Sequence, residues 1–274
     1  GEKIQMKIVT LGPEGTFSHE AVIKYDKKAK IIFADTIRDV FEAVAEDKAN
    51  LAIVPIENSI AGTVGQTLDY LMGFMLKIKA EEILPISHNL VGFGKLGDIK
   101  ILYSHPQTYE QCELFIKKNM PKAEMIQTSS NGKSAEIIAK SKDKTKASII
   151  PKIAVDIYNL KILKRDVQDN MFNITRFFVI SKTDGKKTGH DRTSIAIYPQ
   201  IDRPGLLYGI LGQFSKRKIN LTKIESRPSK GKLGDYIFYI DFDGHKSEKN
   251  VAEALKKIEE TAFLTVLGSY PRKY

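Results

Sequence analysis

The sequence contains one cysteine, no tryptophan and no long hydrophobic run. The single thiol, Cys112, cannot form a disulfide within the chain, and no group of Cys and His residues has the spacing of a zinc site. The longest apolar runs, such as residues 51–56, fall far short of the roughly 18 residues that a membrane-spanning helix requires. No apolar segment near the first residues has the form of a signal peptide. We therefore expect no metal, no membrane association and a cytoplasmic location.

Arginine is also scarce, because the 43 basic residues comprise 35 Lys and only 8 Arg. With 33 acidic residues the net charge is +10, and a basic surface attracts nucleic acid without reading its sequence. The lysines, however, are scattered along the chain and are not gathered into one stripe with aromatic residues between them. We therefore expect no nucleic-acid partner.

The 274 residues suffice for about two domains. From Lys7 onward, short apolar runs alternate with helical periods, which is typical of α/β layers with a largely parallel sheet. Strands are predicted over residues 7–11, 51–54, 99–103, 124–128, 147–150 and 175–180, and helices over 17–25, 37–45, 66–72, 107–118, 133–139 and 151–158. We infer two lobes, the second inserted around residues 85–160, with the chain returning to the first near Phe172.

A charged, glycine-containing stretch, residues 183–191, has no apolar anchor. We place the domain boundary there, between a first domain at 6–182 and a second at 192–274. The second domain has strands predicted at 192–198, 219–225, 235–242 and 264–270, and helices at 205–216 and 249–261. This order, β-α-β-β-α-β, is the ferredoxin-like split unit. Its open sheet edge favours pairing with a second copy.

Polar segments stand where four of the expected elements begin or end. They are GPEGTFS (12–18), PIENS (55–59) with GTVG (62–65), SHPQ (104–107) and NITRF (173–177). In open α/β sheets, ligands bind where strand ends, helix N-termini and loop side chains converge. The segments supply hydroxyls, amides, a carboxylate, a histidine and a guanidinium, and their glycines let backbone N–H groups approach an anion. This set predicts a site for a small, polar, anionic ligand.

Each segment by itself also has a simpler structural explanation. Glycine-rich turns can be only turns, Asn58 and Ser59 can cap a helix, and Arg176 can belong to a surface ion pair. His105, which precedes a proline, is more often a turn residue than a base. The sequence has no G-x-G-x-x-G, Walker or G-x-S-x-G motif. The residues by themselves therefore leave open an enzyme and a non-catalytic, two-lobed small-molecule-binding protein.

Taken together and in this order, with Gln111-Cys112, the four segments closely resemble the prephenate dehydratase family. The C-terminal part resembles that family's ACT domain through DRPGLLY (202–208), INLTKIESRP (219–228) and GH (244–245). The resemblance covers nearly the whole chain from Lys7. It implies a two-lobed, periplasmic-binding-protein-like catalytic domain followed by a ferredoxin-like ACT regulatory domain. Because no chorismate mutase helix domain precedes these segments, it also implies the monofunctional, phenylalanine-regulated form.

The resemblance implies a reaction as well. The family removes the ring hydroxyl of prephenate as water while the ring carboxylate leaves as carbon dioxide, which gives phenylpyruvate for phenylalanine biosynthesis. Aromatisation drives this step, so the site mainly has to hold two carboxylates and help hydroxide depart. No cofactor is implied. Arogenate dehydratase, which performs the same chemistry on the corresponding amino acid, stays an alternative.

The threonine of the family's Thr-Arg-Phe motif is the residue most closely tied to activity, and it corresponds to Thr175. A hydroxyl is a poor acid, so Thr175 would act as a positioned hydrogen-bond donor or proton relay to the departing hydroxyl. Asn58, Ser104 and Gln111 match family positions implicated in the site. Arg176 would suit a substrate carboxylate if its side chain faces the cleft.

The start of the first helix offers a place for a carboxylate, with Thr16, Ser18 and the backbone at Gly15 as donors. Glu57 is either an acid of the site or only a partner of a helix N-terminus. The remaining expected substrate-binding residues are Ser59 and Phe177.

In the ACT domain, the family's Gly-Ala-Leu-Val segment appears as Gly-Leu-Leu-Tyr at 205–208, a departure that changes the volume of the effector pocket. Phenylalanine would bind between two ACT domains, so that regulation and assembly into a homodimer or tetramer form one mechanism. The expected effector-binding residues are Gly205, Leu206, Leu207, Asn220, Leu221, Glu225 and Ser226. Alternatively, Leu206 and Leu207 only pack against the helices.

Overall fold

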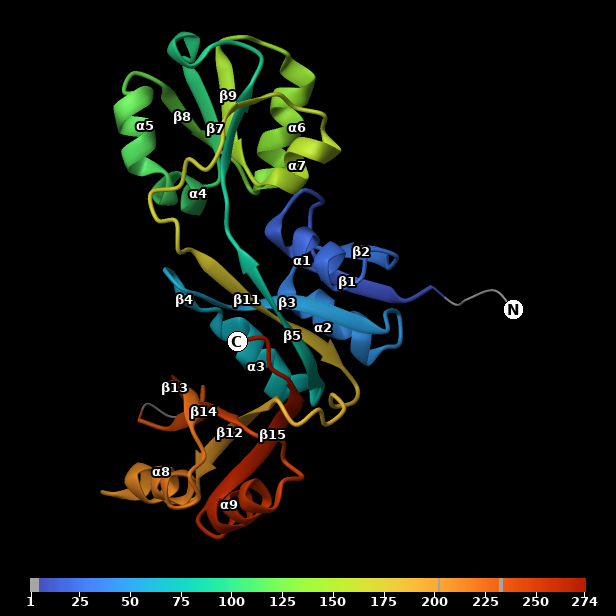
Figure 1. The fold of residues 1–274 in the computed structure, drawn as a ribbon, viewed down its shortest axis with the longest axis vertical. Coiled ribbons are helices and arrows are strands. Elements are labelled where there is room, and N and C mark those ends of the chain that lie inside the picture. Colours follow the sequence, from blue (N-terminus) through green and yellow to red (C-terminus); the bar gives the residue numbers. More distant parts are fainter. Residues whose placement is uncertain (1–4, 202, 232–233) are drawn as a thin grey trace. The chain divides into compact units, whose positions relative to one another are not determined.

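The computed structural model describes residues 5–201, 203–231 and 234–274 (Figure 1). It divides into two compact units, the first made of residues up to 67 with 82–177 and the second of 68–81 with 178–274. The units divide after residues 67, 81 and 177, and each of these points lies inside one helix or strand. The domain boundary at 183–191 stays a prediction. None of the helices in the described part of the chain is long and apolar enough to cross a membrane.

The first sheet has the order β2-β1-β3-β11-β5, with β4 paired to β3. Its strands are β1 (Lys7–Leu11), β2 (Lys30–Ala34), β3 (Leu51–Asn58), β4 (Gly62–Thr63), β5 (Lys77–Pro85) and β11 (Ile174–Ser181). The helices in this part of the chain are α1 (Phe17–Tyr25), α2 (Ile37–Ala45) and α3 (Gly65–Phe74). Thr36 and Asp39 form a capping box at the start of α2.

The expected end of a strand at Val54 is wrong, because β3 continues through Pro55 to Asn58. Proline lacks the N–H that a central ladder needs. The ladder between β1 and β3 ends at Ile53, so Pro55 interrupts no bond to β1. Its carbonyl accepts a hydrogen bond from the Thr67 hydroxyl. The extra residues carry Asn58 to the rim of the first lobe.

The second lobe is built on a sheet with the order β10-β6-β9-β7-β8. Its strands are β6 (Asn89–Gly92), β7 (Ile101–Ser104), β8 (Glu124–Gln127), β9 (Lys146–Ile150) and β10 (Ile162–Lys164). The helical elements are η1 (Leu96–Asp98), α4 (Pro106–Gln111), α5 (Glu113–Asn119), α6 (Asn131–Ser141) and α7 (Lys152–Ile157). All of these elements lie between β5 and β11 in the chain, so the predicted inserted second lobe is confirmed (Figure 1).

A single helix over 107–118 is wrong, because the helix is interrupted at Cys112. The carboxylate of Asp169 accepts hydrogen bonds from the backbone N–H groups of Leu114 and Phe115 and thereby starts α5 anew. A carboxylate at a helix N-terminus satisfies donors that lack partners within the helix.

Two crossover segments join the lobes, and they are hydrogen-bonded to each other. The N–H of Ile86 donates to the carbonyl of Asn173 over 2.8 Å, and the N–H of Val167 donates to the carbonyl of His88 over 2.9 Å. The backbone N–H of His88 also donates to the side-chain oxygen of Gln168. The two crossovers therefore form one paired hinge.

The last sheet has the order β13-β14-β12-β15, and its strand pairs are antiparallel. The elements are β12 (Asp191–Pro199), α8 (Leu206–Lys216), β13 (Leu221–Pro228), β14 (Tyr236–Asp243), α9 (Lys249–Glu259) and β15 (Ala262–Pro271). Both helices contribute to one apolar core with the sheet, in which Phe214 of α8 packs against Phe242 of β14. The predicted β-α-β-β-α-β order is confirmed. Asp202, the first residue of DRPGLLY, lies outside the described residues.

Candidate functional site

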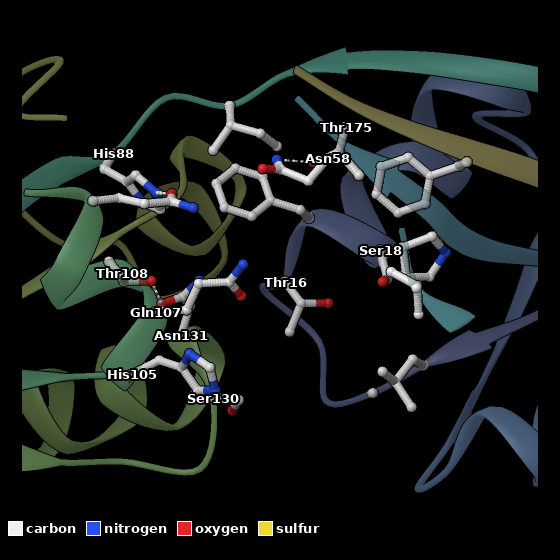
Figure 2. A pocket seen from close by; sticks show the side chains of 18 of the residues that line it. Thr16, Ser18, Asn58, His88, His105, Gln107, Thr108, Ser130, Asn131 and Thr175 are labelled. Atoms are coloured by element: carbon white, nitrogen blue, oxygen red, sulfur yellow. Dashed lines mark hydrogen bonds between the residues drawn. The ribbon is translucent and has the colours of Figure 1, made fainter. Parts of the chain in front are cut away.

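A cavity of about 290 Å³ lies between the two lobes of the first unit (Figure 2). Its polar lining comprises Thr16, Ser18, Asn58, His88, His105, Gln107, Thr108, Gln111, Ser129, Ser130, Asn131 and Thr175. Its other lining residues are Leu11, Gly12, Phe17, Pro55, Val64, Ile86 and Phe177. None of these lining residues is an Asp, Glu, Lys or Arg. A ligand in this cavity would meet neutral donors and acceptors.

Thr175 lies on β11 at the first-lobe side of the cavity, 9% exposed. Its hydroxyl oxygen accepts a hydrogen bond of 2.9 Å from the side-chain amide of Asn58. No residue in the described part of the chain accepts the hydroxyl proton of Thr175. That proton is available to a ligand.

Asn58 is itself held by the backbone. Its side-chain oxygen accepts hydrogen bonds of 2.9 Å from the N–H groups of Ile60 and Ala61. Its amide nitrogen donates to the side-chain oxygen of Asn173 over 2.7 Å as well as to Thr175. The end of β3 thus places an oriented amide beside the hydroxyl.

Two helices from opposite lobes begin at the cavity. Thr16 caps α1 by accepting from the N–H of His19, and Ser130 caps α6 by accepting from the N–H of Lys133. The partial positive charge of a helix N-terminus favours an anion. Figure 2 shows Thr16 on one side of the cavity and Asn131, the first residue of α6, on the other. The arrangement suits a ligand that carries two anionic groups.

Asn131 adds a donor at the second of these helix starts. Its side-chain oxygen accepts the hydroxyl proton of Thr108 over 2.8 Å, which leaves its amide NH₂ as the free end of the side chain. None of the described residues accepts from that NH₂ group. It can therefore donate to a carboxylate at the start of α6.

Burial disfavours the charged form of both histidines that line the cavity. Burial lowers the pKa of His88 and of His105 below the ordinary histidine value. The His88 ring nitrogen Nε2 is 2.9 Å from the side-chain oxygen of Gln111. The His105 ring can offer a polar atom to a ligand, whereas Nε2 of His88 is bonded to Gln111 and its Nδ1 is buried.

Six of the expected substrate-site residues line the cavity together. They are Thr16, Ser18, Asn58, Gln111, Thr175 and Phe177. Glu57, Ser59, Ser104 and Arg176 are not among the lining residues, and a role for them toward the ligand stays a prediction.

Arg176 points away from the cavity and forms an ion pair with Glu57. Side chains alternate along a strand, so Arg176, between the lining residues Thr175 and Phe177, points the opposite way. Its guanidinium is 4% exposed and lies 3.8 Å from the carboxylate of Glu57. The guanidinium is buried, whereas the Glu57 side chain is 34% exposed, and neither residue lines the cavity.

The two serines have local structural roles. The hydroxyl of Ser59 accepts from the N–H of Ile174 over 2.9 Å and so fixes the start of β11. The hydroxyl of Ser104 is buried and donates to the carbonyl of His105 over 3.1 Å. Both positions support residues that line the cavity.

Sequence reasoning missed several lining residues of the second lobe and the hinge: His88, Thr108, Ser129, Ser130 and Asn131. His88 lies within a segment, 77–93, whose sequence indicates only extended structure. The two serines directly precede α6 and Asn131 begins it, and small polar residues at this place are the usual signal of an N-cap. That signal predicts a helix start without indicating that the start faces a ligand.

The expected effector residues lie in two places in the C-terminal unit. Gly205, with φ +81°, and Leu206 stand at the start of α8 and line a cavity of about 170 Å³ between α8 and α9. Leu207, the second residue of α8, is half-buried and does not line that cavity. Asn220, Leu221, Glu225 and Ser226 lie at and along β13 and do not line that cavity.

Leu206 belongs to the apolar core and Leu221 packs against it, while Leu206 also lines the cavity, so both explanations of Leu206 and Leu207 stay open. Glu225 pairs instead with Lys223 and Arg227 on its own strand. Arg227 in turn lies 3.2 Å from the carboxylate of Asp69 on α3. The charged end of β13 is thus tied to a helix of the same unit.

The chain is similar to known proteins over most of its length. The family model for prephenate dehydratase matches residues 8–185, and that for the ACT domain matches residues 200–260. The bifunctional chorismate mutase/prephenate dehydratase of Aquifex aeolicus is 42% identical over 271 residues, which cover 98% of this chain and 74% of that protein. The prephenate dehydratase of Methanocaldococcus jannaschii is 43% identical over 267 residues, which cover 94% and 96%.

A solved structure supports the same comparison in three dimensions. The prephenate dehydratase of Arthrobacter aurescens, in complex with L-Phe, matches with a TM-score of 0.90 and 34% sequence identity. The match covers 97% of this chain and 90% of that one.

Proposed function

The chain belongs to the prephenate dehydratase family and carries its ACT domain, and we propose that the cavity between its lobes converts prephenate into phenylpyruvate. In this reaction the bond from the ring to its carboxylate breaks, and carbon dioxide leaves while the electron pair enters the ring. The bond to the ring hydroxyl breaks at the opposite carbon, and the departing hydroxide takes up a proton and leaves as water. The ring becomes aromatic.

The observation that carries this proposal is the contact between Asn58 and Thr175. Because the Thr175 oxygen already accepts from Asn58, its proton points to another acceptor. A ring hydroxyl that develops negative charge as it leaves is such an acceptor, and a prepositioned donor stabilises that charge. Thr175 is the proposed catalytic residue.

The helix starts at Thr16 and Asn131 are the proposed places for the two carboxylates of the substrate. Binding by neutral donors has a specific advantage for the carboxylate that is lost. A guanidinium would stabilise that group more in the bound substrate than in the transition state, where its charge moves into the ring, and would thus slow the step. A lining without Arg or Lys avoids this penalty.

The same lining favours prephenate over arogenate. Arogenate carries an ammonium group where prephenate has a keto oxygen, and a charge taken out of water is costly without a partner. No Asp or Glu is among the residues that line the cavity. A keto acid needs no such partner, whereas the amino acid does.

The C-terminal unit is the proposed regulatory part. Phenylalanine would bind to it and change turnover without entering the cavity, and two copies would meet there in a homodimer or a tetramer of such dimers. The complex of the Arthrobacter protein with L-Phe supports the effector, and the open edge of β13 supports the pairing. A cytoplasmic location completes the proposal, in keeping with a biosynthetic enzyme family.

The test is a direct assay with purified protein. Prephenate and arogenate are supplied separately, and phenylpyruvate, phenylalanine and carbon dioxide are measured. We expect phenylpyruvate and carbon dioxide in equal amounts from prephenate, and a much lower kcat/KM with arogenate. Failure to release carbon dioxide from either substrate would contradict the proposed activity, and a preference for arogenate would contradict the argument from the lining.

A further inference from the structure

A chain of side-chain hydrogen bonds crosses the first unit from one lobe to the other. It runs from Thr175 to Asn58, from Asn58 to Asn173, from Asn173 to Gln111, and from Gln111 to His88. The bonds measure 2.9, 2.7, 3.0 and 2.9 Å in that order. Asn58 belongs to the first lobe and Gln111 to the second, while Asn173 and His88 lie in the two crossover segments. The chain therefore links both lobes through both halves of the hinge.

The direction of every bond follows from one end of this chain. The backbone N–H groups of Ile60 and Ala61 both donate to the side-chain oxygen of Asn58, so the other end of that amide must be the NH₂ group. The oxygen of Asn173 then accepts from Asn58, and its NH₂ group is left to donate to the Gln111 oxygen. Reversing either amide would place two donors or two acceptors face to face.

The Gln111 oxygen, which accepts from Asn173, also faces Nε2 of His88. This fixes the tautomer of the histidine, because only a protonated Nε2 can donate to an oxygen. The other ring nitrogen, Nδ1, is buried and has no hydrogen-bond partner among the described residues. A proton there would be a buried charge without a counter-ion. The ring is consequently neutral, with its hydrogen on Nε2.

His88 is held in this orientation from several sides. It is 1% exposed, its backbone N–H donates to Gln168, and the ring of Phe17 meets its ring edge to face at 5.3 Å. Burial lowers the pKa of its imidazole, which agrees with the neutral form. Because Nδ1 is shielded and Nε2 is taken up by Gln111, the ring has no polar atom left for a substrate.

We propose that His88 is a positioning residue, which as the neutral Nε2–H tautomer fixes the Gln111 amide and, through Asn173 and Asn58, the hydroxyl of Thr175. Without the donor from His88, the Gln111 oxygen keeps only the bond from Asn173, and the Gln111 side chain is held less firmly. Asn173 is then held less firmly in turn, and the Asn58 amide, which the backbone still orients, loses part of the support that positions its NH₂ group against Thr175. The catalytic part of this inference rests on the proposed function, whereas the hydrogen-bond assignment does not.

Two variants at position 88 separate the donor from the shape of the side chain. His88→Gln keeps an amide NH₂ near the position of Nε2, and His88→Met fills similar space without a donor. We expect His88→Met to lower kcat by roughly 10²-fold, the typical effect of displacing a reacting group by about 1 Å, with little change in KM for prephenate. His88→Gln should recover a large part of that loss. Equal kcat values for the two variants, whether high or low, would overturn the proposal.

A second measurement does not depend on activity. The full chain is labelled with ¹⁵N-histidine, and the long-range ¹H–¹⁵N spectrum reports the tautomer of each ring. We expect His88 as the neutral Nε2–H form in wild type and a loss of this preference in Gln111→Met, in which the acceptor is gone. An Nδ1–H or a charged His88 at neutral pH would overturn the assignment. If wild type shows the expected tautomer but forms no phenylpyruvate, the proposed function fails and the hydrogen-bond assignment stands.

Discussion

Asn58 donates its side-chain amide hydrogen to the hydroxyl oxygen of Thr175 over 2.9 Å, although 117 residues separate the two in the chain. The bond joins the end of β3 to the start of β11. Asn58 is oriented by two backbone N–H groups, and Thr175 retains its own proton. The pair converts an ordinary hydroxyl into a donor with a defined direction.

We expect Thr175→Val, which keeps the branched shape but has no hydroxyl, to lower kcat for prephenate by about 10²- to 10³-fold, the effect of losing one prepositioned donor. Thr175→Ser keeps the hydroxyl and loses only the methyl group that restricts its rotamer, so it should retain much more activity. Steady-state kinetics with thermal unfolding as a control measures this. A Val variant with the kcat of wild type would remove Thr175 from the mechanism.

A second prediction concerns the closeness of the lobes at Gly132. This glycine lies in the first turn of α6, and a Cβ at its position would be 2.2 Å from the carbonyl oxygen of Glu14 in the loop before α1. That neighbour is backbone, so it cannot move aside as a side chain could. We expect Gly132→Ala to separate the helix starts at Thr16 and Asn131 and to lower kcat/KM by roughly 10²-fold, the effect of a displacement of about 1 Å.

Gly73 provides the matched control for this substitution. It lies in α3, and a Cβ there would meet no atom within 4 Å. Gly73→Ala should leave kcat/KM near the wild-type value and, because alanine favours a helix by up to about 1 kcal/mol over glycine, should not destabilise the protein. Kinetics and thermal unfolding of both variants decide the matter. Equal kinetics for the two would show that the approach of Gly132 to Glu14 does not set the shape of the cavity.

The third prediction concerns the dependence of stability on pH. Burial lowers the pKa of His19, His88 and His105 in the folded protein, whereas histidines of the unfolded chain titrate near pH ~6.5. Below that pH the unfolded state therefore binds more protons than the folded state. Their contribution to the free energy of unfolding is fully present above about pH 6.5 and is lost as the pH falls through the lower, folded values.

Urea unfolding of wild type and His88→Gln between about pH 8 and pH 5 measures this effect. Glu20, whose pKa burial raises, titrates with the opposite sign, but it is common to both proteins and cancels in the comparison. We expect the free energy of unfolding to fall less steeply with acidity in His88→Gln, because one of the three groups is gone. A steeper fall in the variant would contradict the expected sign.

The periodicity of the chain sufficed to predict most elements because their apolar faces are local features of the sequence. The interruption at Cys112 was not accessible, since it depends on Asp169, more than fifty residues away. The strand β2, which within the described residues pairs with β1 alone, had no clear signal of its own in residues 30–34.

In the candidate site, the motifs predicted Thr175 and Asn58 as members. Strand alternation, applied to residues 175–177, could have placed Arg176 on the opposite face from its neighbours. That Arg176 is buried and lies beside Glu57, more than a hundred residues away in the chain, is a property of the folded protein. His88 has no local signal of its role. Its neutral tautomer follows only from bonds made by Gln111, Asn173 and the backbone beyond Asn58, which are far apart in sequence and meet only in the folded chain.

The last prediction concerns the ion pair between α3 and β13, the strand on which several of the expected effector residues lie. Arg227, at the end of β13, lies 3.2 Å from Asp69 and 3.8 Å from Glu225. Asp69 is carried by α3, which follows directly on Val64, a residue that lines the cavity. A change at β13 upon phenylalanine binding thus has a charged connection to the helix that continues from the cavity wall.

We expect Asp69→Asn to weaken the effect of phenylalanine on prephenate turnover while leaving kcat without phenylalanine close to wild type, because Asp69 itself does not line the cavity. Lys230→Gln is the control. Lys230 is a second cation, 2.7 Å from Asp69, but the Lys230 side chain is 70% exposed, and such exposed ion pairs contribute little. Allosteric couplings typically change affinity about 5- to 150-fold, and the coupling must act equally in both directions. Calorimetric titration of phenylalanine with and without a non-reacting substrate analogue therefore measures the same quantity as the kinetics. If Asp69→Asn binds phenylalanine and responds to it like wild type, the connection through Arg227 carries no regulation, and the ion pair only stabilises the C-terminal unit.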